Sequence, residues 1–450
     1  MIKKAIRAWS KGSRVERLPD VIFHIGAPKA GSSAIQRFCQ THPEILAKLG
    51  YFYPEHTLDV NGVSGGHTQL AGALLNGKLE QAKVRLEDWL EEARKRKLCL
   101  LVSGEALYGQ AEQMRQLTNT LDVRVVGFLR HPVDYLLGNH NQGIKRHMQT
   151  RRLGQLLMEQ AGRPAPHLVG LPLLKWADAY GDAQCHFLPY RSPGQGGAPI
   201  ERRFLEVLGM PEKEAKALVG NVAITNRSYV TSALELKRLL NTVLPELPDG
   251  LAHRVDWGLQ GYSDKAQDEQ GLSQTDIAAN IRQQLLDELM PQMAPVVTRF
   301  PALAEVAEIP VSTQKAPRQS WLNLSAPLEA LEQGEPELMT QVRQAARSLR
   351  DNGRCDYTFF KLLDVLGIEF EEPSALQNPL SPAARRVLTS EKSRDADVLR
   401  EMAVMLERLG YLDDAMLAIE QALVRRPKGT GIQKIHQRVA EKIKVRKEMA

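Results

Sequence analysis

Cysteines and aromatic residues are scarce in this 450-residue sequence. Its four cysteines include no Cys-x-x-Cys pair, which excludes the common zinc-binding and thioredoxin-like motifs. Cys39, Cys99 and Cys185 lie in apolar segments and are predicted to be small core residues, which suits a reducing compartment. Aromatic side chains make up 6% of the chain, so a carbohydrate-binding surface would have few rings to use.

Long apolar runs are also missing. A transmembrane helix needs roughly 18 or more consecutive apolar residues, and no segment provides them. The basic N-terminal segment, residues 1–18, has no apolar stretch of the kind that a secretory signal carries. These absences favour a cytoplasmic protein.

Positive charge gathers near the two ends of the chain, although the net formal charge is only +6. Residues 1–17 hold six basic residues against one acidic residue, and residues 424–450 hold nine against two. The body between them therefore carries an acidic excess. Basic ends suit peripheral contact with the anionic surface of the inner membrane, and solvated tails are the alternative. Nucleic acid is not an expected partner.

Short apolar runs alternate with helical periodicity between residues 19 and 310. The expected strands are Val21–Ile25, Leu98–Val102, Val123–Leu129 and Cys185–Leu188. The expected helices are Ser33–Leu49, Leu79–Lys97, Ala111–Thr120, Val133–His147, Thr231–Leu244 and Ile277–Thr298. This alternation predicts an α/β fold with a parallel sheet flanked by helices. The glycine-containing turn after the first strand makes the expected sheet P-loop-like.

A linker at residues 311–327 and an all-α region at 328–450 are expected to follow. The segment Ala396–Pro427 resembles one tetratricopeptide repeat, with Leu399, Met402, Ala403, Leu406, Gly410, Ala415, Ile419, Ala422 and Pro427 at the signature positions. Ala403, Ala415 and Ala422 would let two helices pack closely. Glu337–Leu366 is a candidate partner hairpin and Ile432–Ile443 a candidate capping helix. A generic helical hairpin is the alternative, because one clear repeat is a weak signal for an array.

A glycine-containing turn joins the first expected strand to the helix after it. Its sequence is Gly26-Ala-Pro28-Lys29-Ala30-Gly31-Ser32-Ser33. Such a turn exposes backbone N–H groups at a helix N-terminus, which suits an anion. The motif is not a standard P-loop, because the lysine precedes the second glycine and no lysine follows it.

This order resembles the 5′-phosphosulfate loop of sulfotransferases that use 3′-phosphoadenosine 5′-phosphosulfate. The resemblance implies that Lys29 contacts the 5′-phosphate and the bridging oxygen, and that Gly31, Ser32 and Ser33 hold the same phosphate. Pro28 and Ala30 complete the motif. A strand–turn–helix with a chance lysine is the alternative.

A second motif, Arg130-His131-Pro132, follows the strand Val123–Leu129. It resembles the 3′-phosphate motif of the same family, in which a serine stands eight residues after the arginine. Here that position is Gly138, so either Asn139 or a neighbour replaces the serine, or binding of the 3′-phosphate is weakened. The alternative role for Arg130 is a salt bridge at the end of the strand.

The two motifs lie about 100 residues apart in the chain, each after an expected strand, and this conjunction is stronger evidence than either motif alone. The resemblance covers residues 21–298, where Asn221–Ser228 is also similar to a segment of bacterial members. For the base that removes the acceptor's proton, Glu105 is preferred, because it follows the strand Leu98–Val102 at the same edge. The resemblance places a catalytic glutamate here, and a glutamate that stabilises a helix N-terminus is the alternative.

His67 is the second candidate for the base, because a histidine titrates near neutral pH. The leading hypothesis is therefore sulfuryl transfer from 3′-phosphoadenosine 5′-phosphosulfate to a carbohydrate or glycolipid hydroxyl group, or to an amine. No metal is expected. A P-loop nucleotide kinase remains open, and so does an inactive sulfotransferase-like protein that binds partners through residues 328–450. Lys145 and Arg146, at the end of the helix after Arg130, are expected to be solvated, and contact with an anionic acceptor is the alternative.

Overall fold

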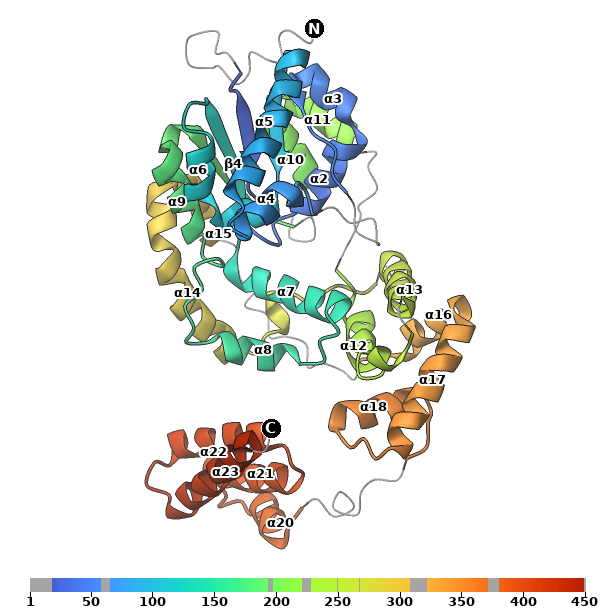
Figure 1. The fold of residues 1–450 in the computed structure, drawn as a ribbon. Helices are drawn as coiled ribbons and strands as arrows, with labels where there is room; N and C mark the ends of the chain where they lie inside the picture. Colours follow the sequence, from blue (N-terminus) through green and yellow to red (C-terminus); the bar gives the residue numbers. More distant parts are fainter. Residues whose placement is uncertain are drawn as a thin grey trace. The chain divides into compact units, whose positions relative to one another are not determined.

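The computed structural model describes residues 18–57, 65–192, 197–220, 228–248, 250–266, 268–307, 322–370 and 380–448. Almost all of the basic N-terminal segment, most of the expected linker, and the segment 221–227 lie outside these ranges. The chain forms two compact units, residues 1–366 and 367–450, each with its own hydrophobic core. Figure 1 shows the course of the chain.

A five-stranded, all-parallel sheet lies in the first unit, which confirms the α/β prediction. Its strands are β1 (Val21–His24), β2 (Tyr51–Phe52), β3 (Cys99–Ser103), β4 (Val123–Arg130) and β5 (Cys185–Tyr190), in the order β2-β3-β1-β4-β5. The strands β1 and β3 are buried along their whole length, so they appear in the sequence as uninterrupted apolar runs. The edge strand β2 was not predicted, because two residues carry no periodic signal.

Helices cover both faces of the sheet (Figure 1). They are α2 (Ser32–Thr41), α3 (Pro43–Leu49), α4 (Thr68–Leu75), α5 (Leu79–Arg96), α6 (Ala111–Leu117), α9 (Leu171–Tyr180), α10 (Ile200–Val207), α11 (Glu212–Val219), α14 (Ala279–Arg299) and α15 (Ala304–Ala307). The predicted helix Ser33–Leu49 is two helices. Pro43 lacks the N–H that a helix interior needs and begins α3 instead.

The predicted core cysteines are confirmed. Cys39, Cys99 and Cys185 are buried in the first unit, and Cys355 is exposed. Burial raises the pKa of each of the three buried thiols, so they remain protonated and act as small apolar side chains.

A layer of further helices begins directly after β4. It consists of α7 (Pro132–Arg146), α8 (Leu153–Gln160), α12 (Thr231–Leu240), α13 (Leu251–Lys265), α16 (Ser325–Gly334), α17 (Pro336–Asp351) and α18 (Tyr357–Val365). Helix α12 packs against α7, α13 and α18, and α13 packs against α16. Residues 325–365 therefore belong to the first unit, and the division between the units falls at residue 366 instead of the predicted 328.

The second unit is a small helical bundle. Its described helices are α20 (Pro382–Thr389), α21 (Asp395–Arg408), α22 (Leu412–Arg425) and α23 (Thr430–Glu448). Ala403, Ala415 and Ala422 are fully buried, so small side chains do let α21 and α22 approach closely. Gly410, with a φ of 82°, makes the turn between the two helices. Of the helices in the described ranges, none is long and apolar enough to cross a membrane.

Candidate functional site

The turn between β1 and α2 has an unusual backbone. Gly26, Lys29 and Gly31 have φ values of 32°, 63° and 85°. A Cβ atom at Gly26 would lie 2.2 Å from Ser32 Oγ, and one at Gly31 would lie 2.9 Å from Ile200. A side chain at either glycine would therefore clash with a neighbouring atom and would also be strained by the positive φ. Lys29 adopts the same left-handed region with a side chain, which marks it as a residue held in place by its surroundings.

Helix α2 begins without any of the usual caps. Its N-cap residue, Gly31, offers no side-chain acceptor, and no acidic residue lies in its first turn. The first N–H groups of a helix have no partner within the helix, so this end carries partial positive charge. The Ser32 side chain lies within the turn and is 4% exposed, and its hydroxyl group has no hydrogen-bond partner among the described residues. The turn is thus suited to an acceptor-rich anion.

Glu105 and Arg130 hold the Lys29 backbone from both sides. The Lys29 N–H donates to Glu105 Oε1 at 3.1 Å, and the Lys29 carbonyl accepts from Arg130 Nη1 at 3.1 Å. Burial lowers the pKa of the Lys29 amine, the Glu105 carboxylate opposes this shift, and the Arg130 charge adds to it. The structure therefore joins three predicted site residues that are widely separated in the sequence.

The carboxyl ends of the strands explain this grouping. Lys29 follows β1, Glu105 begins a 3₁₀ helix, η2 (Glu105–Gly109), just after β3, and Arg130 is the last residue of β4. Because β1 lies between β3 and β4 in a parallel sheet, the three strands deliver these residues to one edge. The neighbouring connections run in opposite directions here, since β1 leads to β2 on one side and β4 leads to β5 on the other.

Gly138, on α7, lies against the Arg130 side chain. A Cβ atom at this position would stand 3.1 Å from Arg130 Nη1 and 3.7 Å from Lys29 Cβ. The position that carries serine in the resembled motif therefore does face the turn. Arg130 Nε is buried without a partner among the described residues. Asn139, which was considered as a replacement for the serine, is exposed.

His67, the second candidate for the base, is enclosed and hydrogen-bonded to the backbone. It is 1% exposed and packs among Tyr53, His56 and Trp89. Its Nδ1 accepts from the Ser103 N–H at 3.0 Å, and its Nε2 lies 2.9 Å from the Pro54 carbonyl, to which it donates. Burial lowers the pKa of His67 to about 4. Both ring nitrogens are thus engaged with the backbone, and the neutral ring links the loop before α4 to the end of β3.

Two further site residues were not predicted from the sequence. The Arg130 guanidinium lies 5.5 Å from the ring centre of Tyr190, the last residue of β5. This tyrosine could have been found, because it follows the same rule as Arg130 and ends a strand at the same edge. Glu201, at the start of α10, lies close enough to Tyr190 for its charge to raise the pKa of that tyrosine, and burial raises the pKa of Glu201 itself. No local sequence signal marks Glu201, because only the packing of α10 on α2 brings it here.

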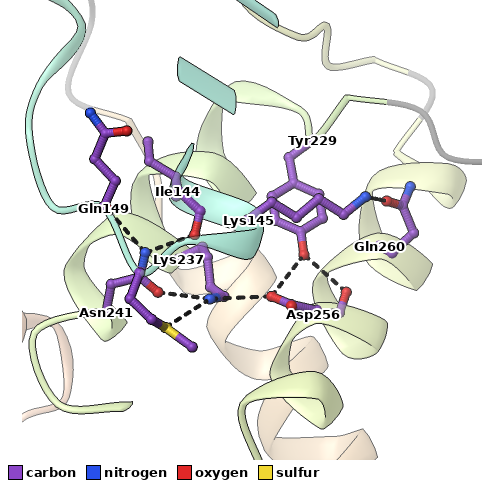
Figure 2. Close-up of polar contacts among 9 residues, drawn as sticks. Ile144, Lys145, Gln149, Tyr229, Lys237, Asn241, Asp256 and Gln260 are labelled. Atoms are coloured by element: carbon purple, nitrogen blue, oxygen red, sulfur yellow. Dashed lines mark hydrogen bonds and ion pairs between the residues drawn. The ribbon is translucent and has the colours of Figure 1, made fainter. Parts of the chain in front are cut away.

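A second polar cluster joins α7 to α12 and α13, and Figure 2 shows it in close-up. Lys237 Nζ contacts Asn241 Oδ1 at 2.7 Å and Asp256 Oδ1 at 3.2 Å. The Tyr229 hydroxyl donates to the Asp256 carbonyl at 3.0 Å, and the Asn241 amide donates to the Ile144 carbonyl at 2.8 Å. We name these five residues the Lys237 cluster.

Lys145 extends this cluster from α7. Its Nζ donates to Gln260 and lies 4.8 Å from the centre of the Tyr229 ring. The side chain is 7% exposed, so the predicted solvated position of Lys145 is wrong. Burial lowers the pKa of Lys145 to about 8. The prediction fails because α12 and α13 cover the end of α7, and the polar sequence of that end gives no sign of this tertiary packing.

Comparison with known proteins adds no assignment. No family model, no curated protein and no solved structure matches this chain. In the described ranges no three His, Cys, Asp or Glu side chains gather as metal ligands would. The function is therefore argued from the turn itself, and the group around Lys29 is the candidate site.

Proposed function

We propose that this chain is a sulfotransferase that transfers a sulfuryl group from 3′-phosphoadenosine 5′-phosphosulfate to a hydroxyl group, or an amine, of a carbohydrate or other surface polymer. The observation that carries the proposal is the grouping of Lys29, Glu105 and Arg130 around a P-loop-like turn. Ligands of open parallel sheets bind at this edge, where neighbouring connections diverge. The cation, the carboxylate and the N–H groups are the three elements that sulfuryl transfer needs.

The turn fits the 5′-phosphosulfate of the donor. The N–H groups at the start of α2 and the unpartnered Ser32 hydroxyl offer donors to phosphate oxygens. The Lys29 amine adds a full charge beside the oxygen that bridges phosphorus and sulfur. The Ser32 hydroxyl group and the N–H groups already belong to the turn, so little reorganisation of them is needed when negative charge grows on the leaving phosphate.

In the reaction, an acceptor oxygen forms a bond to sulfur while the bond from sulfur to the bridging oxygen breaks. The leaving group is 3′-phosphoadenosine 5′-phosphate, and the two oxygens lie roughly in line, as in phosphoryl transfer. Lys29 stabilises the charge on the leaving oxygen. Glu105 takes the proton of the attacking hydroxyl group, because it is the carboxylate beside Lys29.

Glu105 is a better base than His67 in this geometry. The Glu105 side chain is half-buried at the edge of the sheet and contacts the turn. The His67 ring is buried, and the backbone uses both of its nitrogens. A base must reach its proton directly or through one water molecule, and of these two side chains Glu105 is the one that contacts the turn.

The test is the release of 3′-phosphoadenosine 5′-phosphate from the donor in the presence of a panel of glycans. Transfer to at least one glycan is expected, and Glu105→Gln should stop transfer without loss of nucleotide binding. Absence of binding of that nucleotide in calorimetry would overturn the donor assignment. Magnesium-dependent binding of ATP instead would favour a nucleotide kinase.

For the second unit, we propose a tetratricopeptide-like role in binding a protein partner. The support is the close packing of α21 on α22 through Ala403, Ala415 and Ala422. If the unit is repeat-like, a bulky residue at Ala403 should separate the two helices. Ala403→Leu is then expected to lower the melting temperature of this unit and to weaken partner binding, while the activity of the first unit is unchanged.

A further inference from the structure

The Glu105 carboxylate accepts a hydrogen bond from a backbone N–H of the very turn that is suited to an anion. That N–H belongs to Lys29, and the contact measures 3.1 Å. Successive N–H groups in a turn with left-handed residues point into a shared hollow that attracts negative charge. Lys29 and Gly31 both have left-handed φ values. A carboxylate therefore already uses one of the donors that a phosphate would use.

We propose that Glu105 occupies the anion position of the turn when no phosphate is bound, and that the donor's 5′-phosphate displaces it. The displaced carboxylate then becomes the base for the acceptor. The identity of the donor in this inference rests on the proposed function. The competition between the carboxylate and a bound anion rests only on the structure of the turn. If the inference is right, Glu105 can act as a base only after the donor has bound.

The charges around the turn explain why displacement is feasible. Glu105 is one carboxylate against the cations of Lys29 and Arg130 and the partial charge at the start of α2. The phosphosulfate group of the donor carries more charge and more acceptor oxygens than a carboxylate, so it can engage several of these donors at once. Like charges at contact distance repel strongly, so the carboxylate and the phosphate cannot share the Lys29 N–H.

Arg130 keeps the turn in place during this exchange. Its guanidinium holds the Lys29 carbonyl, which is the opposite end of the residue from the N–H that Glu105 leaves. Tyr190 and Gly138 flank the guanidinium. Lys29 can therefore stay in its left-handed conformation while its N–H changes partners. In this scheme Arg130 is a positioning residue for the turn.

Substitution of Glu105 should make anions bind more tightly, which is the opposite of what loss of a ligand-positioning residue would do. Glu105→Gln keeps an oxygen that can accept from the Lys29 N–H and removes the charge. We expect its dissociation constants for 3′-phosphoadenosine 5′-phosphate and for inorganic pyrophosphate, from calorimetry, to fall about tenfold, a change of about 1.4 kcal/mol. Glu105→Ala, which removes the acceptor as well, should also tighten binding.

The matched control is Glu112→Gln, which makes the same chemical change on an exposed side chain of α6. Its anion affinity should equal that of the unaltered protein. Unchanged or weaker binding of both anions to Glu105→Gln overturns the displacement. So does weaker binding to Glu105→Ala, because Glu105 would then serve only to shape the turn.

The two proposals fail in different ways in this experiment. If the nucleotide binds but Glu105→Gln does not tighten it, the displacement is wrong and the donor assignment stands. If Glu105→Gln tightens pyrophosphate and neither protein binds the nucleotide, the displacement stands and the donor assignment is wrong. If no anion binds to either protein, both are wrong. Lys29→Ala should weaken anion binding in every positive case, which locates the anion at the turn.

Discussion

The turn around Lys29 and the Lys237 cluster are both polar groups in the first unit, yet they satisfy their polar atoms differently. In the Lys237 cluster, Lys237, Asn241 and Asp256 all have close protein partners. At the turn, the Ser32 hydroxyl and Arg130 Nε are buried without a partner among the described residues. Orphaned buried donors cost free energy, and an anion bound at the turn would supply the missing acceptors.

This difference distinguishes a polar cluster that holds the fold together from one that is suited to bind a ligand. Lys237 is fully buried and Asp256 is 4% exposed, and burial lowers the pKa of the lysine and raises that of the aspartate. Their mutual attraction opposes both shifts. The cluster therefore fastens α12 and α13 together and has no group left over for a ligand. At the turn, the Ser32 hydroxyl group and Arg130 Nε remain without a partner among the described residues, and both can donate hydrogen bonds to an anion.

The largest expected effect is on stability, at Lys237. Lys237→Ala leaves the Asp256 carboxylate buried without its cation, which should cost about 3–5 kcal/mol of the free energy of unfolding. Denaturant unfolding followed by tryptophan fluorescence measures it, because all five tryptophans precede residue 367 and report on the first unit. The double change Lys237→Met with Asp256→Leu should recover most of the loss. A loss below about 1 kcal/mol for Lys237→Ala would contradict a structural role for the pair.

The next effect is on transfer, at Lys29. Lys29→Ala removes the cation beside the leaving oxygen and should lower kcat by about 10²–10³. Unfolding free energy should change little, because the Lys29 contacts in the turn are made by its backbone. Lys175→Ala, which removes an exposed lysine of α9, is the control and should leave kcat unchanged. Equal rates for Lys29→Ala and the unaltered protein would remove the catalytic role.

An intermediate effect is expected at His67, and it depends on pH. The pKa of His67 is about 4 in the folded protein against an ordinary value of 6.5, so the unfolded chain binds more protons between these values. The effect of His67 on the free energy of unfolding is therefore most favourable above pH 6.5 and declines as the pH drops toward 4. At pH 5 the loss from this residue is about 2 kcal/mol. In His67→Gln this part of the pH dependence should disappear. His147→Gln, which changes an exposed histidine, is the control and should keep this pH dependence. If the slope of unfolding free energy against pH is unaltered in His67→Gln, other groups cause the acid sensitivity.

The smallest effect is expected at Gly138. A side chain there meets the end of the flexible Arg130 side chain at 3.1 Å, and serine is a better helix former than glycine. Gly138→Ser should therefore change the unfolding free energy by less than about 1 kcal/mol. The added hydroxyl group should raise the preference for 3′-phosphoadenosine 5′-phosphate over 5′-AMP by a few fold in calorimetry. A drop in that preference would mean that Arg130 alone reads the 3′-phosphate and needs the space at Gly138.

Much of the sheet could be predicted because its strands are short buried runs with clear ends. The predicted strand Val123–Leu129 differs from β4 by one residue. The edge where Lys29, Glu105 and Arg130 meet followed from the rule that parallel strands end together. The contacts among them did not follow, since a hydrogen bond from the Lys29 N–H to Glu105 depends on one turn's backbone conformation.

The sequence by itself determined which residue types end each strand, where glycine must stand in the turn, and where small residues let α21 and α22 pack. These are local properties of pattern and conformation. Only the tertiary structure decided that His67 is enclosed, that Lys145 is covered, and that residues 325–365 belong with the first unit. Burial is set by elements distant in the chain. A polar side chain at a helix end looks the same in the sequence whether another helix covers it or water does.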